Sequence, residues 1–85
     1  MPTNTPNLSA RLGRNLRAIR LGRDLSQKSL ARHMGVNPSY IGSIERGERN
    51  LTLASMVDLA GDLGVPWEDL LADPDAGDGA ASHTV

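Results

Sequence analysis

Cysteine is absent from this chain of 85 residues, and its two histidines, His33 and His83, stand far apart. A disulfide framework, a thiolate zinc site and an iron–sulfur cluster are therefore excluded together, and we expect no cofactor. The length suits one small domain and leaves no room for a deep pocket under a separate lid. We expect no enzymatic activity, since no nucleophile–base or carboxylate pair with a pocket is apparent.

Long apolar runs are also missing. No stretch of about 18 apolar residues is present, so no transmembrane helix is predicted. Residues 1–7 have neither the cationic start nor the apolar run of a secretory signal, and we expect a flexible arm there. Residues 74–85 are rich in Gly, Ala and Asp, which predicts a disordered acidic tail. We therefore expect a cytoplasmic protein with one folded domain at residues 8–73.

Cations are absent from the second half of the chain. Residues 1–50 hold all nine Lys and Arg against three carboxylates, a net charge of +6, whereas residues 51–85 hold seven carboxylates, a net charge of −7. The overall charge of −1 is thus a cancellation between two halves. This asymmetry indicates a face that binds a polyanion. The alternative is a solvated basic helix beside an acidic one.

The first half shows the apolar period of helices. A stripe at helical spacing predicts a helix over residues 8–21, and it consists of Leu8, Leu12, Leu16 and Ile19. Arg11, Arg14 and Arg17 follow the polar side, where we expect a solvated face. Gly22 can end this helix, and Asp24 can take a left-handed conformation in the connection.

Two further helices follow at close spacing. Ser26 is a good N-cap for a helix that buries residues 30, 31 and 34 and stops at Gly35. Asn37 can cap the next helix, with Pro38 at its first position, and this helix should run to about residue 46. Its Ile41 and Ile44 point to the core.

The remaining pattern is helical as well. Thr52 caps a fourth helix, which ends at Gly64 and is expected to bury Leu53, Met56, Val57, Ala60 and Leu63. Residues 67 to 71 or 72 form a short fifth helix. No window has the period of two that a strand needs. The sequence predicts a compact, all-α domain of five helices.

Helices 2 and 3, joined by a turn of about three residues that contains Gly, match the helix-turn-helix arrangement. The sequence resembles the DNA-binding domains of the lambda and 434 repressor and Cro superfamily, also called the xenobiotic response element family. The resemblance covers residues 12–71 and is carried by Leu12-Gly13, Leu16, Arg17, Arg20, Leu25-Ser26-Gln27, Leu30-Ala31, Gly35-Val36, Ile41, Ile44-Glu45, Gly47 and Leu63-Gly64-Val65.

Within that superfamily the segment over residues 39–52 looks most like the controller proteins of restriction-modification operons, and related regulators of phages and mobile elements share much of it. Three positions depart from the pattern. The family commonly has Gly in place of Asp24 and Pro in place of Leu51. Controller proteins of this type can carry Arg in place of Pro38, so a bidentate contact from that position to guanine cannot form here.

We expect the second helix of this pair to enter the major groove. Its outward side is predicted to carry the residues nearest the bases, namely Asn37, Ser39, Tyr40, Gly42 and Ser43. Phosphate contacts are expected on both sides of it, from Ser26, Gln27, Arg46, Arg49 and Asn50. If Asn37 uses its side-chain oxygen to cap the helix, less of it is free to contact a base. For Tyr40, partial core packing is the alternative.

Two other sets of residues receive structural roles. The resemblance implies that Arg20 and Glu45 form an ion pair between helices 1 and 3. Val65, Pro66 and Trp67 are expected at a twofold interface, because one domain contacts only a half-site and a dimer places two such helices about 34 Å apart. Core packing is the alternative for Trp67.

These features predict a homodimeric, sequence-specific regulator of transcription that binds double-stranded DNA at a (pseudo)palindromic operator, in a bacterium, phage or mobile element and associated with the nucleoid. It would act by occupancy, as a repressor by exclusion or as an activator by touching polymerase. We expect no small-molecule effector, since the binding module and the tails use up the chain. The alternatives are an antitoxin-type module that also binds a toxin, and a protein-interaction adaptor without DNA affinity.

Overall fold

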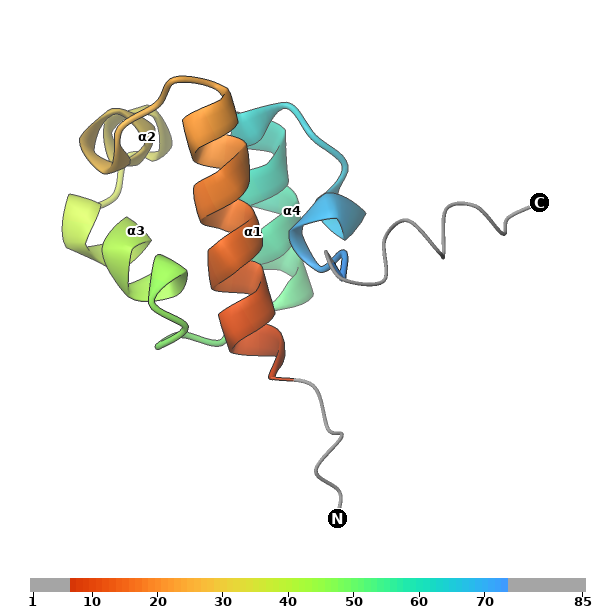
Figure 1. The fold of residues 1–85 in the computed structure, drawn as a ribbon. Coiled ribbons are helices and arrows are strands. Elements are labelled where there is room, and N and C mark those ends of the chain that lie inside the picture. Colours follow the sequence, from red (N-terminus) through yellow and green to blue (C-terminus); the bar gives the residue numbers. More distant parts are fainter. Residues whose placement is uncertain (1–6, 74–85) are drawn as a thin grey trace, which may run out of the picture.

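The computed structural model describes residues 7–73, and within this range every element is helical. Four α-helices, α1 (Leu8–Gly22), α2 (Gln27–Met34), α3 (Pro38–Glu45) and α4 (Leu53–Leu63), are followed by the 3₁₀ helix η1 (Trp67–Leu70). In Figure 1, α1 runs through the middle of the molecule with α2 and α3 on one side and η1 on the other, while α4 lies behind it. The predicted arm at residues 1–6 and tail at residues 74–85 lie outside the described residues.

The helix starts follow the capping residues in the sequence. The side chains of Ser26, Asn37 and Thr52 accept hydrogen bonds from the backbone amides of Ser29, Ser39 and Ser55, respectively. Such a bond satisfies one of the amides that a helix start leaves without an intrahelical partner. These three starts were predicted, and they set the short spacing between α2 and α3.

The helix ends agree with the prediction to within about one residue. Gly35, Gly47 and Gly64 have positive φ, as helix-ending glycines often do. Asp24, the one other residue with positive φ in the described range, has φ 58°, so the left-handed conformation predicted for it is confirmed. The fifth helix is a 3₁₀ turn of four residues, which is too short to repay the cost of nucleating an α-helix.

The core is formed by ten apolar side chains contributed by all five elements: Leu12, Leu16, Leu30, Ala31, Ile41, Ile44, Leu59, Ala60, Leu63 and Leu70. Two predicted core positions, Leu53 and Val57, are wrong, and the first residue of the apolar stripe on α1 is exposed as well. Leu8 at the start of α1 is 51% exposed, and on α4 Leu53 and Val57 are 55% and 46% exposed. The buried stripe of α4 runs through Leu59 and Leu63 instead, and Leu53 and Val57 lie beside it.

The crossing of α1 and α3 fixes where α3 sits. A Cβ atom on Gly13 would lie 2.5 Å from the carbonyl oxygen of Ile44 and 2.6 Å from that of Glu45. Only a residue without a side chain permits such a close approach of two helix backbones. Because α3 also packs on α2, it is held from two sides.

Candidate nucleic-acid interface

The start of α2 combines a capping hydroxyl with free helix amides. Ser26 Oγ accepts from the Ser29 amide at 2.9 Å and donates to Ser29 Oγ at 2.9 Å. The first amides of the helix point out of its end and have no intrahelical partner, and they sit at the positive end of the helix dipole. Ser26 is exposed and Gln27 half-buried, so this end of α2 has the chemistry of an anion-binding surface.

Glu45, at the end of α3, joins three elements of the domain. Its Oε2 accepts from Arg20 Nε at 2.6 Å, and its Oε1 accepts from Arg20 Nη2 and from Gln27 Nε2, both at 3.0 Å. Arg20 also donates from Nη1 to the Leu25 carbonyl at 2.7 Å and is 5% exposed. The predicted partners Arg20 and Glu45 are therefore paired across α1 and α3. The link from Glu45 to Gln27 was not predicted.

The charges of this cluster stabilise one another. Burial alone would raise the pKa of Glu45, but the hydrogen bonds from Arg20 and Gln27 and the positive charges of Arg20 and Arg17 outweigh it, so that pKa is lowered. The hydrogen bond to Glu45 raises the pKa of Arg20 in turn, although burial opposes this. Both groups are ionised near neutral pH, and α2, α3 and α1 are thereby connected by charge-assisted hydrogen bonds.

The start of α3 presents exposed polar groups. Asn37 Oδ1 accepts from the Ser39 amide and from Ser39 Oγ, each at 2.9 Å. The side-chain oxygen is thus used for capping, whereas Asn37 Nδ2 makes no hydrogen bond within the described residues. Asn37, Pro38 and Ser39 are all exposed. This end of the helix therefore offers a ligand the donors of Asn37 Nδ2 and, as an acceptor, the Ser39 hydroxyl oxygen.

The outward placement predicted for Gly42 and Ser43 is wrong, because both are buried together with Ile41 and Ile44. A Cβ on Gly42 would lie 3.2 Å from Arg46 Nη1 and 3.5 Å from Gln27 Oε1, so side chains of this chain cover it. Ser43 is 8% exposed, and its hydroxyl donates to the Tyr40 carbonyl at 2.7 Å. The α3 helix is only eight residues long and is enclosed by α1 and α2, which leaves few positions on it exposed.

Tyr40 and Arg49 lie against each other at the edge of α3. The guanidinium carbon of Arg49 is 5.0 Å from the centre of the Tyr40 ring, a cation–π distance. Arg49 Nε also donates to Ser43 Oγ at 2.7 Å. Tyr40 is half-buried and borders a groove of about 400 Å³ between the α2–α3 turn and α4. Tyr40 is therefore partly packed, as the alternative interpretation held, and Arg49 remains exposed.

Arg46 is paired within its own loop. Its Nε donates to Glu48 Oε2 at 2.9 Å and its Nη2 to Glu48 Oε1 at 3.2 Å, and both side chains are more than half exposed. The hydrogen bond raises the pKa of Arg46 and lowers that of Glu48. The sequence reasoning missed this pair, although opposite charges two residues apart in a turn are a signal for it. A phosphate at Arg46 would have to compete with Glu48.

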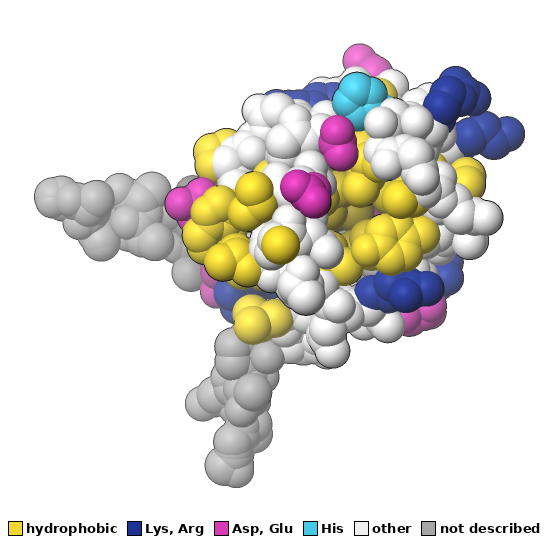
Figure 2. Space-filling view, turned by 180° about the vertical axis from the view of Figure 1, so that it is seen from behind, with side chains coloured by type: hydrophobic (Ala, Val, Ile, Leu, Met, Phe, Trp, Pro, Cys, Tyr) yellow, Lys and Arg dark blue, Asp and Glu magenta, His cyan; other side chains and the backbone are white. Residues whose placement is uncertain are grey.

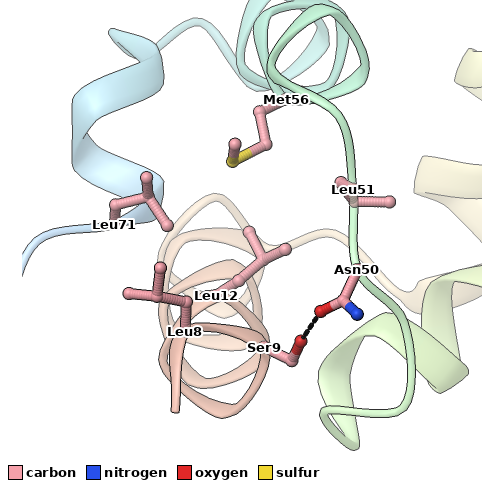
Figure 3. Close-up of a pocket in the computed structure, with 7 residues that line it drawn as sticks. All are labelled: Leu8, Ser9, Leu12, Asn50, Leu51, Met56 and Leu71. Carbon is pink, nitrogen blue, oxygen red and sulfur yellow. Dashed lines mark hydrogen bonds between the residues drawn. The ribbon is translucent and has the colours of Figure 1, made fainter. Parts of the chain in front are cut away.

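Asn50 is exposed and accepts a hydrogen bond from Ser9 Oγ on α1. Figure 3 shows this contact at the rim of a pocket of about 140 Å³, whose other walls are apolar and come from α1, the α3–α4 connection, α4 and the residue after η1. The connection is thus tied to the start of α1. Asn50 therefore lies directly after the residues of the loop that carries Arg46 and Arg49.

The face that carries α4 differs in charge from the rest. Figure 2 shows Asp and Glu side chains between apolar patches on this face, with Lys and Arg near its margins. Among the predicted interface residues, Pro66 is exposed, while Val65 and Trp67 are half-buried and pack on the core. Leu53 and Val57 on α4, which the sequence reasoning assigned to the core, add exposed apolar area.

Some arginines serve the domain itself. Arg23 Nε donates to the Leu63 carbonyl at the end of α4 at 2.6 Å, and Arg11 lies 3.7 Å from Asp73.

Within residues 7–73 no group of three or more His, Asp or Glu side chains could hold a metal ion. No helix in that range is long and apolar enough to cross a membrane.

Residues 16–70 match the family model HTH_3, helix-turn-helix. The chain belongs to this helix-turn-helix family. Control protein C.SmaI of Serratia marcescens is 47% identical over 49 residues, 58% of this chain, and the match spans 58% of that relative's length. Control protein C.BamHI of Bacillus amyloliquefaciens is 38% identical over 68 residues, 79% of this chain and 84% of the relative.

A solved structure gives the same result for this helix-turn-helix chain. The crystal structure of the restriction-modification controller protein C.AhdI from Aeromonas hydrophila matches with a TM-score of 0.68 and 37% identity, over 73% of this chain and 94% of that one. The resemblance to the superfamily, and within it to controller proteins, is confirmed. All of the elements that carry the proposed interface lie inside the matched residues.

Proposed function

We propose that this chain is a sequence-specific regulator of transcription that binds double-stranded DNA as a homodimer at a (pseudo)palindromic operator, as a controller protein of a restriction-modification system would. The observation that carries the proposal is the arrangement of α2, the short turn and α3, with polar groups exposed at the starts of both helices and Arg49 exposed in the loop after α3. The control proteins to which the chain is similar support it. An enzymatic role has no support from these relatives.

In this proposal α2 and α3 are the helix-turn-helix of a lambda-repressor-like domain spanning residues 8–73, and the start of α3 enters the major groove. Asn37, Ser39 and Tyr40 are the residues nearest the bases. Asn37 Nδ2, which makes no hydrogen bond within the described residues, can donate to an acceptor on a base edge, while Oδ1 caps the helix. Gly42 and Ser43 take no part in base contacts, because they are buried.

Phosphate contacts would come from the start of α2 and from the loop after α3. Ser26 and Gln27 at the start of α2 would bind one phosphate, with the backbone amides as the main donors. Arg46, Arg49 and Asn50 in the loop would bind further phosphates, and the Arg46 side chain lies beside that of Gln27 at Gly42. Of the two arginines, Arg49 has its terminal nitrogens free for this contact, whereas Arg46 must first leave Glu48.

The dimer interface would lie on the side of α4 and η1, away from α3. It includes Val65, Pro66 and Trp67, and the exposed Leu53 and Val57 support it, because apolar side chains of this size favour burial against a partner. The described residues from 51 to 73 include no Lys or Arg, so this side would be kept off the phosphates. Regulation would then follow protein concentration and operator occupancy.

The test is a titration of labelled duplex DNA at several salt concentrations. Loss of one phosphate contact lowers the salt slope by about one. We expect Arg49→Ala to weaken binding and flatten the slope in this way. Arg11→Ala, which removes the same charge beside Asp73, is the control and should change both much less. If the two variants behave alike, or if the wild-type chain binds no duplex at low salt, the proposal is wrong.

A further inference from the structure

Ser43 makes two side-chain hydrogen bonds, one within α3 and one to the loop that follows α3. Its hydroxyl donates to the Tyr40 carbonyl, one turn back in the helix, at 2.7 Å. The same oxygen accepts from Arg49 Nε at 2.7 Å. A hydroxyl has a single hydrogen, so the bond to Tyr40 fixes its orientation and turns a lone pair toward Arg49. With 8% of its surface exposed, Ser43 is poorly placed to touch a ligand itself.

The Tyr40 ring holds the other side of the same guanidinium. The guanidinium carbon is 5.0 Å from the ring centre, and Tyr40 is itself half-buried against the core. Arg49 is therefore held by a hydrogen bond at Nε and by an aromatic face, both supplied by α3. Its four remaining N–H donors, on Nη1 and Nη2, make no hydrogen bond within the described residues. These donors form the flat edge that binds a phosphate or a guanine with two parallel bonds.

Arg46 provides the contrast within the same loop. Its Nε and its Nη2 both donate hydrogen bonds to the Glu48 carboxylate. The Glu48 carboxylate thus occupies two nitrogens of Arg46 that could otherwise donate to a phosphate. Arg49 forms no ion pair with a carboxylate of the described residues, although its charge helps to lower the pKa of Glu48. The group at its Nε is a neutral hydroxyl, which leaves its terminal nitrogens available.

We propose that Ser43 is a positioning residue for DNA binding: it holds Arg49 on the Tyr40 ring in the free protein, so that the terminal nitrogens face the DNA before it arrives. The proposal rests on the proposed function. A long side chain loses conformational freedom when it binds, and one that is already ordered loses less. Ser43 would then contribute to affinity without touching DNA, and its contribution would depend on Arg49.

The first experiment needs no DNA. In a ¹⁵N NMR spectrum of the free chain, we expect the Arg49 Nε–H signal to be shifted and slow to exchange with solvent. Ser43→Ala should return it to the position and exchange rate of the other exposed arginines. Ser39→Ala, which removes an exposed hydroxyl from the same helix, is the control and should leave it unchanged. An Arg49 signal that Ser43→Ala does not change overturns the proposal.

The second experiment is a double-mutant cycle for binding to a selected duplex. Ser43→Ala should weaken binding by about tenfold, and Arg49→Lys, which keeps the charge but has no Nε, should weaken it at least as much. In the Arg49→Lys background, Ser43→Ala should have almost no further effect. Equal losses in both backgrounds would make Ser43 merely structural and contradict the proposal. Thermal melting of each variant checks folding, and Ser43→Cys, with a weaker acceptor of similar size, should fall in between.

The two experiments separate the possible failures. If the wild-type chain binds no duplex while the Arg49 signal responds to Ser43→Ala, the proposed function is wrong and the Ser43–Arg49 contact has no role in DNA binding. If the wild type binds DNA but the cycle shows no coupling, the function stands and the positioning role of Ser43 is wrong.

Discussion

At the scale of single residues, the two loop arginines differ in what holds them. Glu48 occupies the Nε and Nη2 groups of Arg46 with a full negative charge, whereas Ser43 takes only the Nε of Arg49. Because a carboxylate beside a DNA phosphate is repelled and also competes for Arg46, Glu48 should limit affinity. A residue with this effect would tune how much protein is needed to fill an operator.

The corresponding prediction concerns Glu48→Gln. We expect it to raise affinity for duplex DNA several-fold at low salt and to steepen the salt dependence, because Arg46 becomes free to replace a counterion. Fluorescence anisotropy with a labelled duplex measures both. Glu68→Gln, which removes an exposed carboxylate on η1, is the matched control and should have a smaller effect. Equal effects of the two changes would mean that only the net charge matters.

Glu45 makes a prediction about pH. Its pKa in the folded chain is below the ordinary value of 4.5, so its pairing stabilises the fold above about pH 4.5 and is lost as the pH falls through the lowered pKa. Glu45→Gln leaves Arg20 buried without a counter-charge and should cost about 3 kcal/mol at pH 7. Urea unfolding of both chains from pH 7 to pH 3 measures this. A difference that stays constant below pH 4 would show that the charge of Glu45 is not its cause.

At the scale of helices, the sequence predicted well where each element begins, but it predicted less well which side of each helix is buried. Ser26, Asn37 and Thr52 were identifiable as caps because capping is a local interaction. The burial of Ser43 depends on α1 and α2 enclosing a short α3, which no local pattern encodes. Leu53 and Val57 were assigned to the core because an apolar side chain looks the same in sequence whether it faces the core or the surface.

The crossing of α1 and α3 gives the prediction at this scale. Gly13→Ala should lower the free energy of unfolding by about 1–3 kcal/mol, since the added methyl group meets two backbone carbonyls of α3 that have no room to move. Gly61→Ala on α4 is the control. Nothing lies within 4 Å of a Cβ there, so the better helix propensity of Ala should stabilise the chain by about 0.5–1 kcal/mol. Urea unfolding that ranks the two variants in the opposite order would contradict this view of the crossing.

At the scale of the whole molecule, the positive and negative halves of the sequence correspond to different elements of the fold. The cations lie on α1, the connection from α1 to α2, α2 and the loop after α3, and the charged residues of α4 and η1 are all negative. The arrangement separates a proposed DNA side from a proposed dimer side. The sequence indicated the two sides but could not supply the exposed pair Leu53 and Val57 on α4, which depends on the packing of the helix.

The dimer prediction follows from that pair. Val57→Glu places a charge on the proposed interface without disturbing the core, because this position is 46% exposed. We expect the wild type to sediment as a dimer at micromolar concentration and the variant as a monomer with much weaker operator binding. Asp58→Glu, the neighbouring exposed position, should not change the mass. A wild-type chain that stays monomeric even with operator added would rule out the homodimer.

The central claim is that this domain recognises a DNA sequence, and selection of bound duplexes from a random pool by the purified chain tests it most directly. We predict enrichment of one short half-site repeated in inverted orientation, with the centres about 34 Å or one helical turn apart. Ser39→Ala should change the preferred bases, while Arg49→Ala should reduce recovery of all sequences. Recovery of no sequence above the starting pool would contradict the claim and favour a protein-interaction role for the fold.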